Sequence, residues 1–400
     1  MVSARVAAEA VNELTLKPDQ SERADHCSWS HCTFCLRGLL DLKGVGHEYR
    51  RLPSERIVAD FFQVRSLGAR SVTLADEDLL GANDARALSV VETFETLARS
   101  LGDPIAFDAS ATVHSIFSAS RPRDLQLARE DLIRRLKLSG LRKIFLGVES
   151  GSDSQLKRYA KGHTRHEAQE AIRILRRHGV AVELGWIMFD PLCTLDEIHE
   201  NVGFLLASDT ADATSYLFNE LRLQRDTHYQ HLLDVHRQRS GSSDALYDTH
   251  FDRDTLSFRY SYADADVASL VKCAREWQDI LRPIHYPLKN LTRYGVSGEL
   301  SDHISEPRAI LTDLRRNMCA ALVSEIEILA GAGSRDSESM TSFVVSAAQR
   351  VVEWSETLPD YLKGIEIVHV LLEGARTAIA PTRRGENIQL TNRASNQDIR

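Results

Sequence analysis

The sequence lacks the features that mark several large classes of protein. No apolar run approaches the roughly 20 residues that a membrane-spanning helix needs, so no membrane partner is expected. Residues Met1–Glu13 have neither the apolar core nor the cleavage site of a secretory signal. The net charge is −8, which argues against bulk electrostatic binding of nucleic acid. No disulfide framework is expected, because three of the six cysteines stand far apart, at Cys193, Cys273 and Cys319. A cytoplasmic protein is therefore expected.

The other three cysteines lie close together. Four residues separate Cys27 from Cys32, and two separate Cys32 from Cys35. Thiolates at this spacing can hold a metal ion or an iron–sulfur cluster, because soft sulfur ligands suit both. A closed zinc site would need a fourth ligand, which His26 or His31 could supply. The spacing alone therefore leaves a cluster and a zinc site open.

Short apolar runs alternate with longer amphipathic segments through the first half of the chain. Strands are expected over residues 71–75, 104–109, 143–148, 182–189 and 216–223, with a short strand over 11–16 before the cysteines. Helices are expected over residues 53–67, 83–101, 125–139, 164–178 and 194–207. Strands that alternate with helices form βαβ units, and these build a parallel sheet.

Six such units favour an α/β fold, a partial (β/α)6 TIM-like barrel with an α-helical C-terminal region. The β/α barrel is preferred because acidic residues follow the strands, where such barrels carry their chemistry; these are Asp76, Asp108, Glu149 and Asp190.

Four regions are expected along the chain. They are an N-terminal extension over 1–20, the core over 21–226, a helical region over 227–375 and a polar, disordered tail over 376–400. Helices are expected over 267–281, where Pro283 stops the first, over 307–330, and twice more before Thr377. Their apolar faces must be buried somewhere, so we expect them to cover the open side of the barrel.

Five segments in order resemble the radical S-adenosylmethionine (radical SAM) superfamily across roughly residues 20–230. They are the three cysteines with Phe34 before the last, Leu74–Asp78, Phe145–Asp153, Leu156–Thr164 and Gly185–Pro191. They are most similar to the branch that contains the elongator acetyltransferase-like core, the methylthiotransferases and several peptide- and natural-product-maturing enzymes. One departure is that four residues separate Cys27 from Cys32, one more than in the commonest motif.

The resemblance implies two cofactors, a [4Fe–4S] cluster and S-adenosylmethionine. Cys27, Cys32 and Cys35 would hold three irons, and the fourth iron would bind the amino and carboxylate groups of S-adenosylmethionine. An electron from an external donor, such as flavodoxin or ferredoxin, would cleave this cofactor to methionine and a 5′-deoxyadenosyl radical. The radical would then abstract hydrogen from a substrate carbon.

The resemblance also implies contacts to S-adenosylmethionine. Glu149 and Ser150 would hold the ribose, Asp76 and Glu77 the amino group, and Asp190 would approach the adenine. Phe34 would lie beside the cluster or the adenine. Each residue has a structural alternative. Glu149 could be an ordinary strand-end carboxylate, and the Ser150 hydroxyl could bond to the backbone. Asp76 and Glu77 could be charges at a helix N-terminus, Asp190 could belong to a turn, and Phe34 could simply be packed. The histidines, including His114, are interpreted as surface or satisfied residues, and no catalytic residue is assigned.

The substrate is expected to be a peptide, such as a precursor of a ribosomally made natural product, or a secondary metabolite. The alternative is a methyl or methylthio transferase, although a methylthiotransferase is expected to carry a second cysteine trio. A cobalamin-using methylase is expected to carry a cobalamin domain, for which the 26 residues before Cys27 leave no room. The alternative from another class is a non-catalytic zinc-binding protein on the same barrel.

Overall fold

The computed structural model describes residues 27, 29, 31–36, 53–241, 245–293, 299–331 and 340–383. The expected N-terminal extension and the strand over 11–16 lie outside these residues. The chain divides into two compact units, Met1–Val271 and Lys272–Arg400. The first unit includes residues 227–271, beyond the boundary at 226 that the sequence suggests.

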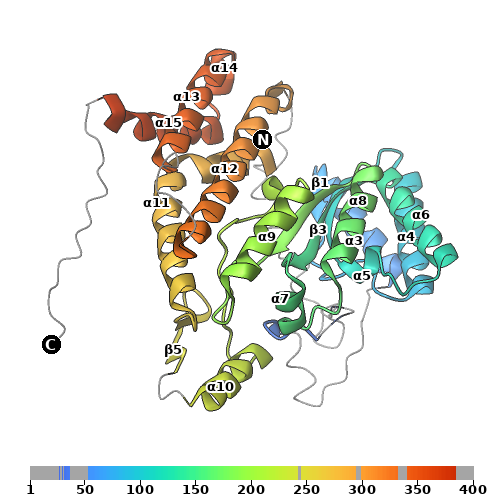
Figure 1. The fold of residues 1–400 in the computed structure, drawn as a ribbon. Helices are drawn as coiled ribbons and strands as arrows, with labels where there is room; N and C mark the ends of the chain where they lie inside the picture. The colour runs from blue at the N-terminus through green and yellow to red at the C-terminus, as the bar shows by residue number, and fades with distance from the viewer. Residues whose placement is uncertain are drawn as a thin grey trace. The chain divides into compact units, whose positions relative to one another are not determined.

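A parallel sheet of four strands forms the centre of the first unit, in the order β1 (Ser71–Thr73), β2 (Ala106–Thr112), β3 (Leu141–Glu149) and β4 (Ala181–Trp186). Five longer helices alternate with the strands (Figure 1): α3 (Ser54–Ser66), α4 (Asp84–Leu101), α6 (Arg123–Leu138), α8 (Arg165–Arg177) and α9 (Leu195–Ala207). The prediction of an α/β fold with a parallel sheet is confirmed. Each of the five helices expected between residues 53 and 207 is present.

Local sequence explains these elements. Thr164 and Glu167 form a reciprocal capping box at the start of α8, and Thr194 with Glu197 does the same for α9. Strand residues such as Phe107 are fully buried, and its ring stacks on Phe94 of α4 at 4.4 Å between centroids. Hydrophobic burial of the sheet under these helices drives this half of the fold.

Two expectations about the strands are wrong. Residues 216–223 form no strand; Glu220 makes an isolated parallel bridge to Phe189, beyond the end of β4, and Leu223 makes an isolated antiparallel bridge to Phe258. The carbonyl of Asn219 accepts bonds from both Met188 and Phe189, so the chain turns here instead of running along β4. Strand β2 extends to Thr112, so Asp108 lies within it, ion-paired with Arg142, and not at its end.

The last part of the first unit, after residue 220, packs against Phe34 of the cysteine loop. Helix α10 (His228–Ser240) is followed by the antiparallel hairpin of β5 (Tyr247–Asp252) and β6 (Ser257–Tyr260). Phe34 packs against a buried cluster that contains Tyr159, Ile187, Leu221, Leu223, Tyr229, Leu233 and Phe258. This part of the chain, expected to be helical, therefore supports the loop with both a helix and a hairpin.

The second unit is helical, as expected. Its helices are α11 (Ala265–Arg293, which begins in the first unit), α12 (Ser305–Leu329), α13 (Met340–Glu356), α14 (Asp360–Lys363) and α15 (Glu366–Arg383). Helix α11 does not stop at Pro283 but continues past Pro287. Gly374 of α15 lies against this part of α11: a Cβ there would lie 1.9 Å from the Pro283 carbonyl oxygen, so only glycine allows the approach.

Helix α15 also reaches beyond residue 376, where the polar tail is expected to begin; residues 384–400 lie outside the described chain. None of the helices in the described residues is long and apolar enough to cross a membrane.

Candidate functional site

The cysteine loop is fixed to the segment that follows the short helix α7 (Asp153–Arg158). The backbone N–H of Thr33 donates to the carbonyl of Tyr159 at 2.9 Å, and its hydroxyl donates to the carbonyl of Arg158 at 3.0 Å. The indole N–H of Trp29 donates to the carbonyl of Ala160 at 2.8 Å. Three hydrogen bonds to three successive carbonyls therefore set the position of the loop relative to the sheet.

A glycine and two aromatic rings complete this attachment. Gly162 has a φ of +74°, and a Cβ there would lie 2.1 Å from the Trp29 ring, so the indole needs a glycine beneath it. Phe34 packs edge-on against Tyr159, with 5.3 Å between ring centroids. Phe34 therefore lies beside the cysteines as the resemblance implies, but its contacts are also those of ordinary packing.

None of the three cysteines on this loop forms a disulfide within the described residues; Cys32 is buried, and Cys27 and Cys35 are half-buried. Burial raises the pKa of the Cys27 thiol to about 12. The hydrogen bond that the Trp29 backbone N–H donates to the Cys27 sulfur, at 3.4 Å, lowers this pKa but does not offset burial. Burial likewise raises the pKa of Cys32. Within the described residues, no three His, Cys, Asp or Glu side chains converge on a point where one metal ion could bind.

The donor chemistry nevertheless fits an iron–sulfur cluster, because a single short loop presents three soft sulfur ligands. Binding would release the thiol protons, and a neighbouring cation would favour the thiolates. Lys161 is such a cation, and its charge lowers the pKa of Cys32 against the effect of burial.

Glu149 ends β3 in an unusual conformation. Its φ is +72°, and the register between β3 and β4 shifts between Gly147 and Glu149. Gly147 and Gly185 pair across these strands, and a Cβ on Gly185 would lie 3.0 Å from Glu149 Oε1. The two glycines therefore clear the space in which the carboxylate lies.

Lys161 is the partner of this carboxylate, with 3.5 Å between its Nζ and Glu149 Oε1. Only 7 % of Lys161 is exposed. Burial opposes its charge, but Cys32, Glu149 and Cys27 together raise its pKa above the ordinary value. Sequence reasoning missed Lys161 because lysine is rarely buried, and only its place in the segment Leu156–Thr164 could have drawn attention to it.

Ser150 is placed differently from its neighbour. It is fully buried, and its hydroxyl bonds to Gln155 Oε1 at 2.6 Å and to Asn201 Oδ1 at 2.8 Å. Its oxygen also accepts the backbone N–H of Ser152 at 2.9 Å. The structure thus brings Glu149 toward the thiols, whereas it uses Ser150 to join the turn after β3 to α9.

Asp190 is also fully buried. Its Oδ2 accepts from Arg158, Gln155 and Tyr159, each at 2.8 Å, and Tyr229 donates to its Oδ1. Burial raises its pKa, but the Arg158 guanidinium and these bonds hold it below the ordinary value. Asp190 therefore joins α7, the end of β4 and α10, and its oxygens have partners within the protein.

The acidic segment after β1 contains one residue that the sequence analysis passed over. Asp76 is half-buried and Glu77 is exposed, whereas 1 % of Asp78 is exposed. Asp78 accepts from the hydroxyls of Ser115, at 2.6 Å, and Thr112, at 3.1 Å. Its charge adds to the rise in the pKa of the Cys27 thiol.

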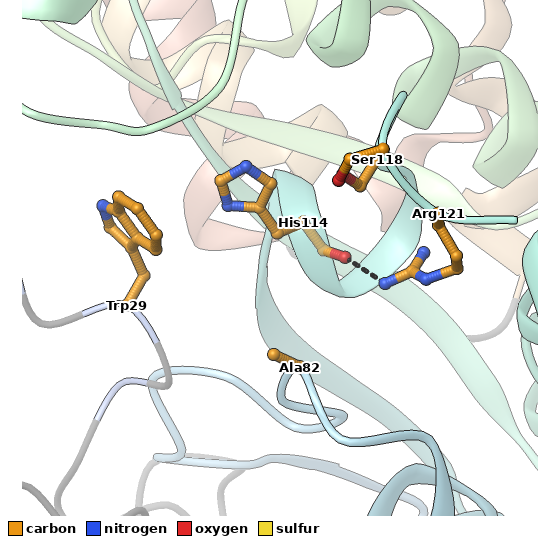
Figure 2. Close-up of a pocket in the computed structure, with 6 residues that line it drawn as sticks. Trp29, Ala82, His114, Ser118 and Arg121 are labelled. Carbon is orange, nitrogen blue, oxygen red and sulfur yellow. Dashed lines mark hydrogen bonds between the residues drawn. The ribbon is translucent and has the colours of Figure 1, made fainter.

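A pocket of about 400 Å³ lies beside the loop (Figure 2), lined by Trp29, Ala82, His114, Ser118, Ser120 and Arg121. His114 belongs to the short helix α5 (Val113–Ile116), and its Nε2 lies 3.1 Å from the carbonyl oxygen of Gly162. Burial lowers the pKa of His114, so the imidazole is neutral at pH 7. No role is predicted for His114 from the sequence, because no local pattern indicates this pocket.

Residues 22–202 match the family model of the radical SAM superfamily. These residues therefore form a domain of this superfamily, whose enzymes use a [4Fe–4S] cluster and S-adenosylmethionine together with a reductant.

Two curated relatives show which members it resembles. It is 32 % identical over 196 residues to 4′-phospho-dehydrooxetanocin synthase of Priestia megaterium, which covers 47 % of this chain and 26 % of that protein. It is 30 % identical over 145 residues to tRNA-2-methylthio-N(6)-dimethylallyladenosine synthase of Chlorobium luteolum, which covers 36 % and 29 %. The chain thus spans well under half the length of these relatives.

Solved structures share the fold. The structure of the cobalamin-dependent S-adenosylmethionine radical enzyme OxsB with aqua-cobalamin bound superposes with a TM-score of 0.62 at 19 % identity, over 89 % of this chain and 57 % of that one. Its complex with aqua-cobalamin and S-adenosylmethionine gives 0.61 at 20 % identity. The likeness establishes the α/β partial barrel as the fold of this chain.

Proposed function

We propose that this chain holds a [4Fe–4S] cluster on Cys27, Cys32 and Cys35, cleaves S-adenosylmethionine and abstracts hydrogen from a small-molecule substrate. The observation that carries the proposal is the fixed loop of three thiols with the buried Lys161–Glu149 pair beside it. The family match over residues 22–202 supports the same chemistry.

Cys27, Cys32 and Cys35 would hold the cluster, which would supply the one electron that reductive cleavage of S-adenosylmethionine requires. An external reductant such as flavodoxin or ferredoxin supplies that electron. The protein's own residues position the cofactor: the Glu149 carboxylate accepts hydrogen bonds from the ribose hydroxyls, and Lys161 holds that carboxylate in place. Phe34 and Tyr159 exclude water from the base of the loop, which protects a reactive radical.

A small molecule is favoured over a peptide as the substrate. The relative from Priestia megaterium is named as the synthase of a phosphorylated, non-peptide product, and it aligns with about half of this chain. A secondary metabolite is therefore the substrate class that we propose. Comparison of this substrate with its product would identify the reaction that follows hydrogen abstraction.

The test is to purify the protein without oxygen and measure iron and acid-labile sulfide. About four irons and four sulfides per chain are expected, with a brown colour. Replacing Cys27, Cys32 and Cys35 together with alanine removes both the colour and the release of 5′-deoxyadenosine. One zinc and no iron in the wild-type protein would instead support the non-catalytic zinc-binding alternative.

A methyl or methylthio transferase is the second candidate, because one curated relative is a methylthio-forming synthase. The two functions differ in their products. A transferase releases S-adenosylhomocysteine together with 5′-deoxyadenosine, whereas the proposed hydrogen abstraction releases 5′-deoxyadenosine alone. Mass spectrometry of the cofactor products during turnover therefore separates them.

A further inference from the structure

The pocket beside the cysteine loop combines flat rings and a cation in one concave site (Figure 2). Its volume of about 400 Å³ lies in the range of small-molecule sites. Trp29 and Arg121 lie on opposite sides of His114 in this view, with Ala82 below them. The lining thus changes from aromatic at one end to positively charged at the other.

The aromatic end is rigid. Trp29 and His114 have ring centroids 5.0 Å apart and an interplanar angle of 54°. The indole is held by its bond to Ala160, and the imidazole by its contact with the carbonyl of Gly162. Rings held in this way offer faces and edges to a planar ligand at little cost in conformational entropy.

The charged end is not neutralised by the protein. Arg121 donates to the carbonyl of His114 at 2.8 Å and to Gln126 Oε1 at 3.0 Å, and both acceptors are uncharged. Within the described chain, no carboxylate lies within ion-pair distance of Arg121. Asp84, the acid that contributes to its electrostatics, is already paired with Arg129.

Hydroxyl groups lie beside this cation. Ser118 and Ser120 line the same pocket, and their hydroxyl oxygens are 2.9 Å apart. A half-buried guanidinium with hydroxyl donors nearby is an arrangement that suits a phosphate group, because the phosphate oxygens accept from all of them.

We propose that this pocket binds a phosphorylated, ring-bearing small molecule, such as a nucleotide, with its ring against Trp29 and His114 and its phosphate at Arg121. Trp29 lies between Cys27 and Cys32 in the sequence, so a ligand here is held next to the cysteine loop. That this ligand is the substrate of the enzyme rests on the proposed function. The proposed binding rests on the pocket alone.

The test uses adenosine 5′-monophosphate, adenosine and inorganic phosphate as probes, without S-adenosylmethionine. Binding is measured by calorimetry and by the change in tryptophan fluorescence. Adenosine 5′-monophosphate should bind saturably to the wild-type protein. Arg121→Gln should weaken its binding by about tenfold to a hundredfold, because a hydrogen-bonded charge is lost, but should leave adenosine binding unchanged.

Two further variants localise the effect. Trp29→Phe should remove most of the fluorescence change, whereas the calorimetric signal of inorganic phosphate binding should persist. Arg134→Gln is the matched control, because Arg134 is an exposed arginine paired with Asp131, and it should bind the probes like the wild-type protein. Thermal melts of each variant confirm that it is folded.

Equal affinity of the wild-type protein and Arg121→Gln for adenosine 5′-monophosphate would overturn the proposal, as would the absence of binding. Inorganic phosphate binding as tightly as the nucleotide would overturn the role of the rings. Iron content and S-adenosylmethionine cleavage, measured on the same preparations, report on the proposed function separately. A preparation with an intact cluster and no nucleotide binding contradicts this inference alone.

Discussion

Glu149 shows how much local structure a single functional side chain requires. A positive φ is costly for a residue with a Cβ, and it persists only where the surroundings enforce it. Here the bulge at the end of β3 enforces it, Gly147 and Gly185 leave room for the carboxylate, and Lys161 balances its charge. A conformation maintained at such cost is consistent with a role in binding.

Replacing Glu149 with alanine should weaken S-adenosylmethionine binding while the cluster remains. Hydrogen bonds to a charged group contribute about 1.5–3 kcal/mol, so an affinity loss of roughly tenfold or more is expected. Titration of the reconstituted protein with S-adenosylmethionine measures it. Glu149→Gly should give the same loss without backbone strain. Unchanged affinity in both variants would remove Glu149 from the site.

Gly185→Ala should impair binding although it replaces no cofactor-binding side chain. The added Cβ would lie 3.0–3.2 Å from the Glu149 carboxylate atoms, so the carboxylate must shift. The expected result is a weaker affinity for S-adenosylmethionine, in the same titration. Gly203→Ala in α9 is the matched control, because nothing lies within 4 Å of its Cβ position. Equal affinities in the two glycine variants would contradict this account.

At the scale of residues, the sequence identifies the three cysteines and the carboxylate at the end of β3. It does not identify the residues that contact them in the folded protein. The resemblance and the place of Glu149 after an apolar strand both predict a site role for it, and in the structure its charge acts on the Cys32 thiol. Lys161 and Asp78 are buried charges that only the tertiary structure reveals. Conversely, Ser150 and Asp190 come at the right positions in the sequence, yet burial commits their oxygens to internal bonds.

At the scale of elements, Asp190 joins segments that are far apart in the chain. Its carboxylate receives bonds from α7, through Arg158, and from α10, through Tyr229. Tyr229 also donates its backbone N–H to the carbonyl of Thr33 in the cysteine loop, at 2.8 Å. One buried anion therefore fixes the elements on both sides of that loop.

Asp190→Asn should destabilise the protein at pH 7 by about 3–5 kcal/mol, because it leaves the buried charge of Arg158 with one fewer anion. The pKa of Asp190 is lowered in the folded state, so its contribution is present above the unfolded value of about 3.9. The contribution is lost as the pH falls toward the folded value. Urea denaturation of both proteins from pH 7 to pH 3 measures this.

The difference in free energy of unfolding between the two proteins should narrow in acid, because protonated aspartate resembles asparagine in charge. The exposed Asp131→Asn is the control, and it should change stability by no more than about 1 kcal/mol. A difference that stays constant across this range would show that Asp190 acts by shape and not by charge.

Element boundaries were predictable where local chemistry sets them. The capping boxes of α8 and α9 are visible in the sequence and are present in the structure. The segment over 216–223 misled because its apolar residues pack in the cluster with Tyr229 instead of pairing along β4. Helix α11 continues past its expected end at Pro283, and Gly374 of another helix lies against the Pro283 carbonyl, which no local pattern reveals.

At the scale of the whole molecule, the family match ends before the first unit does. The match covers residues 22–202, whereas the first unit continues to Val271. The difference contains α10 and the β5–β6 hairpin, which bury Tyr159 and pack on Phe34. Residues outside the matched domain thus support the cysteine loop. A covering role for the helices of the second unit stays a prediction.

A fragment that ends at Asp226 should lose the support of the cysteine loop, whereas one that ends at Val271 should retain it. The shorter fragment lacks Tyr229, and with it the bonds to Thr33 and Asp190. It also exposes Tyr159, Leu221 and Leu223, which are buried in the intact unit, so aggregation is expected. Iron content after anaerobic reconstitution and the oligomeric state by gel filtration measure the two effects.

The fragment ending at Val271 is the control for loss of the second unit, since both fragments lack it. It should remain monodisperse and bind about four irons, as three thiols with one open iron require. If the fragment ending at Asp226 bound as much iron as this control and stayed soluble, α10 and the hairpin would be dispensable for the loop. The boundary of the functional core would then lie at residue 226, as the sequence alone suggests.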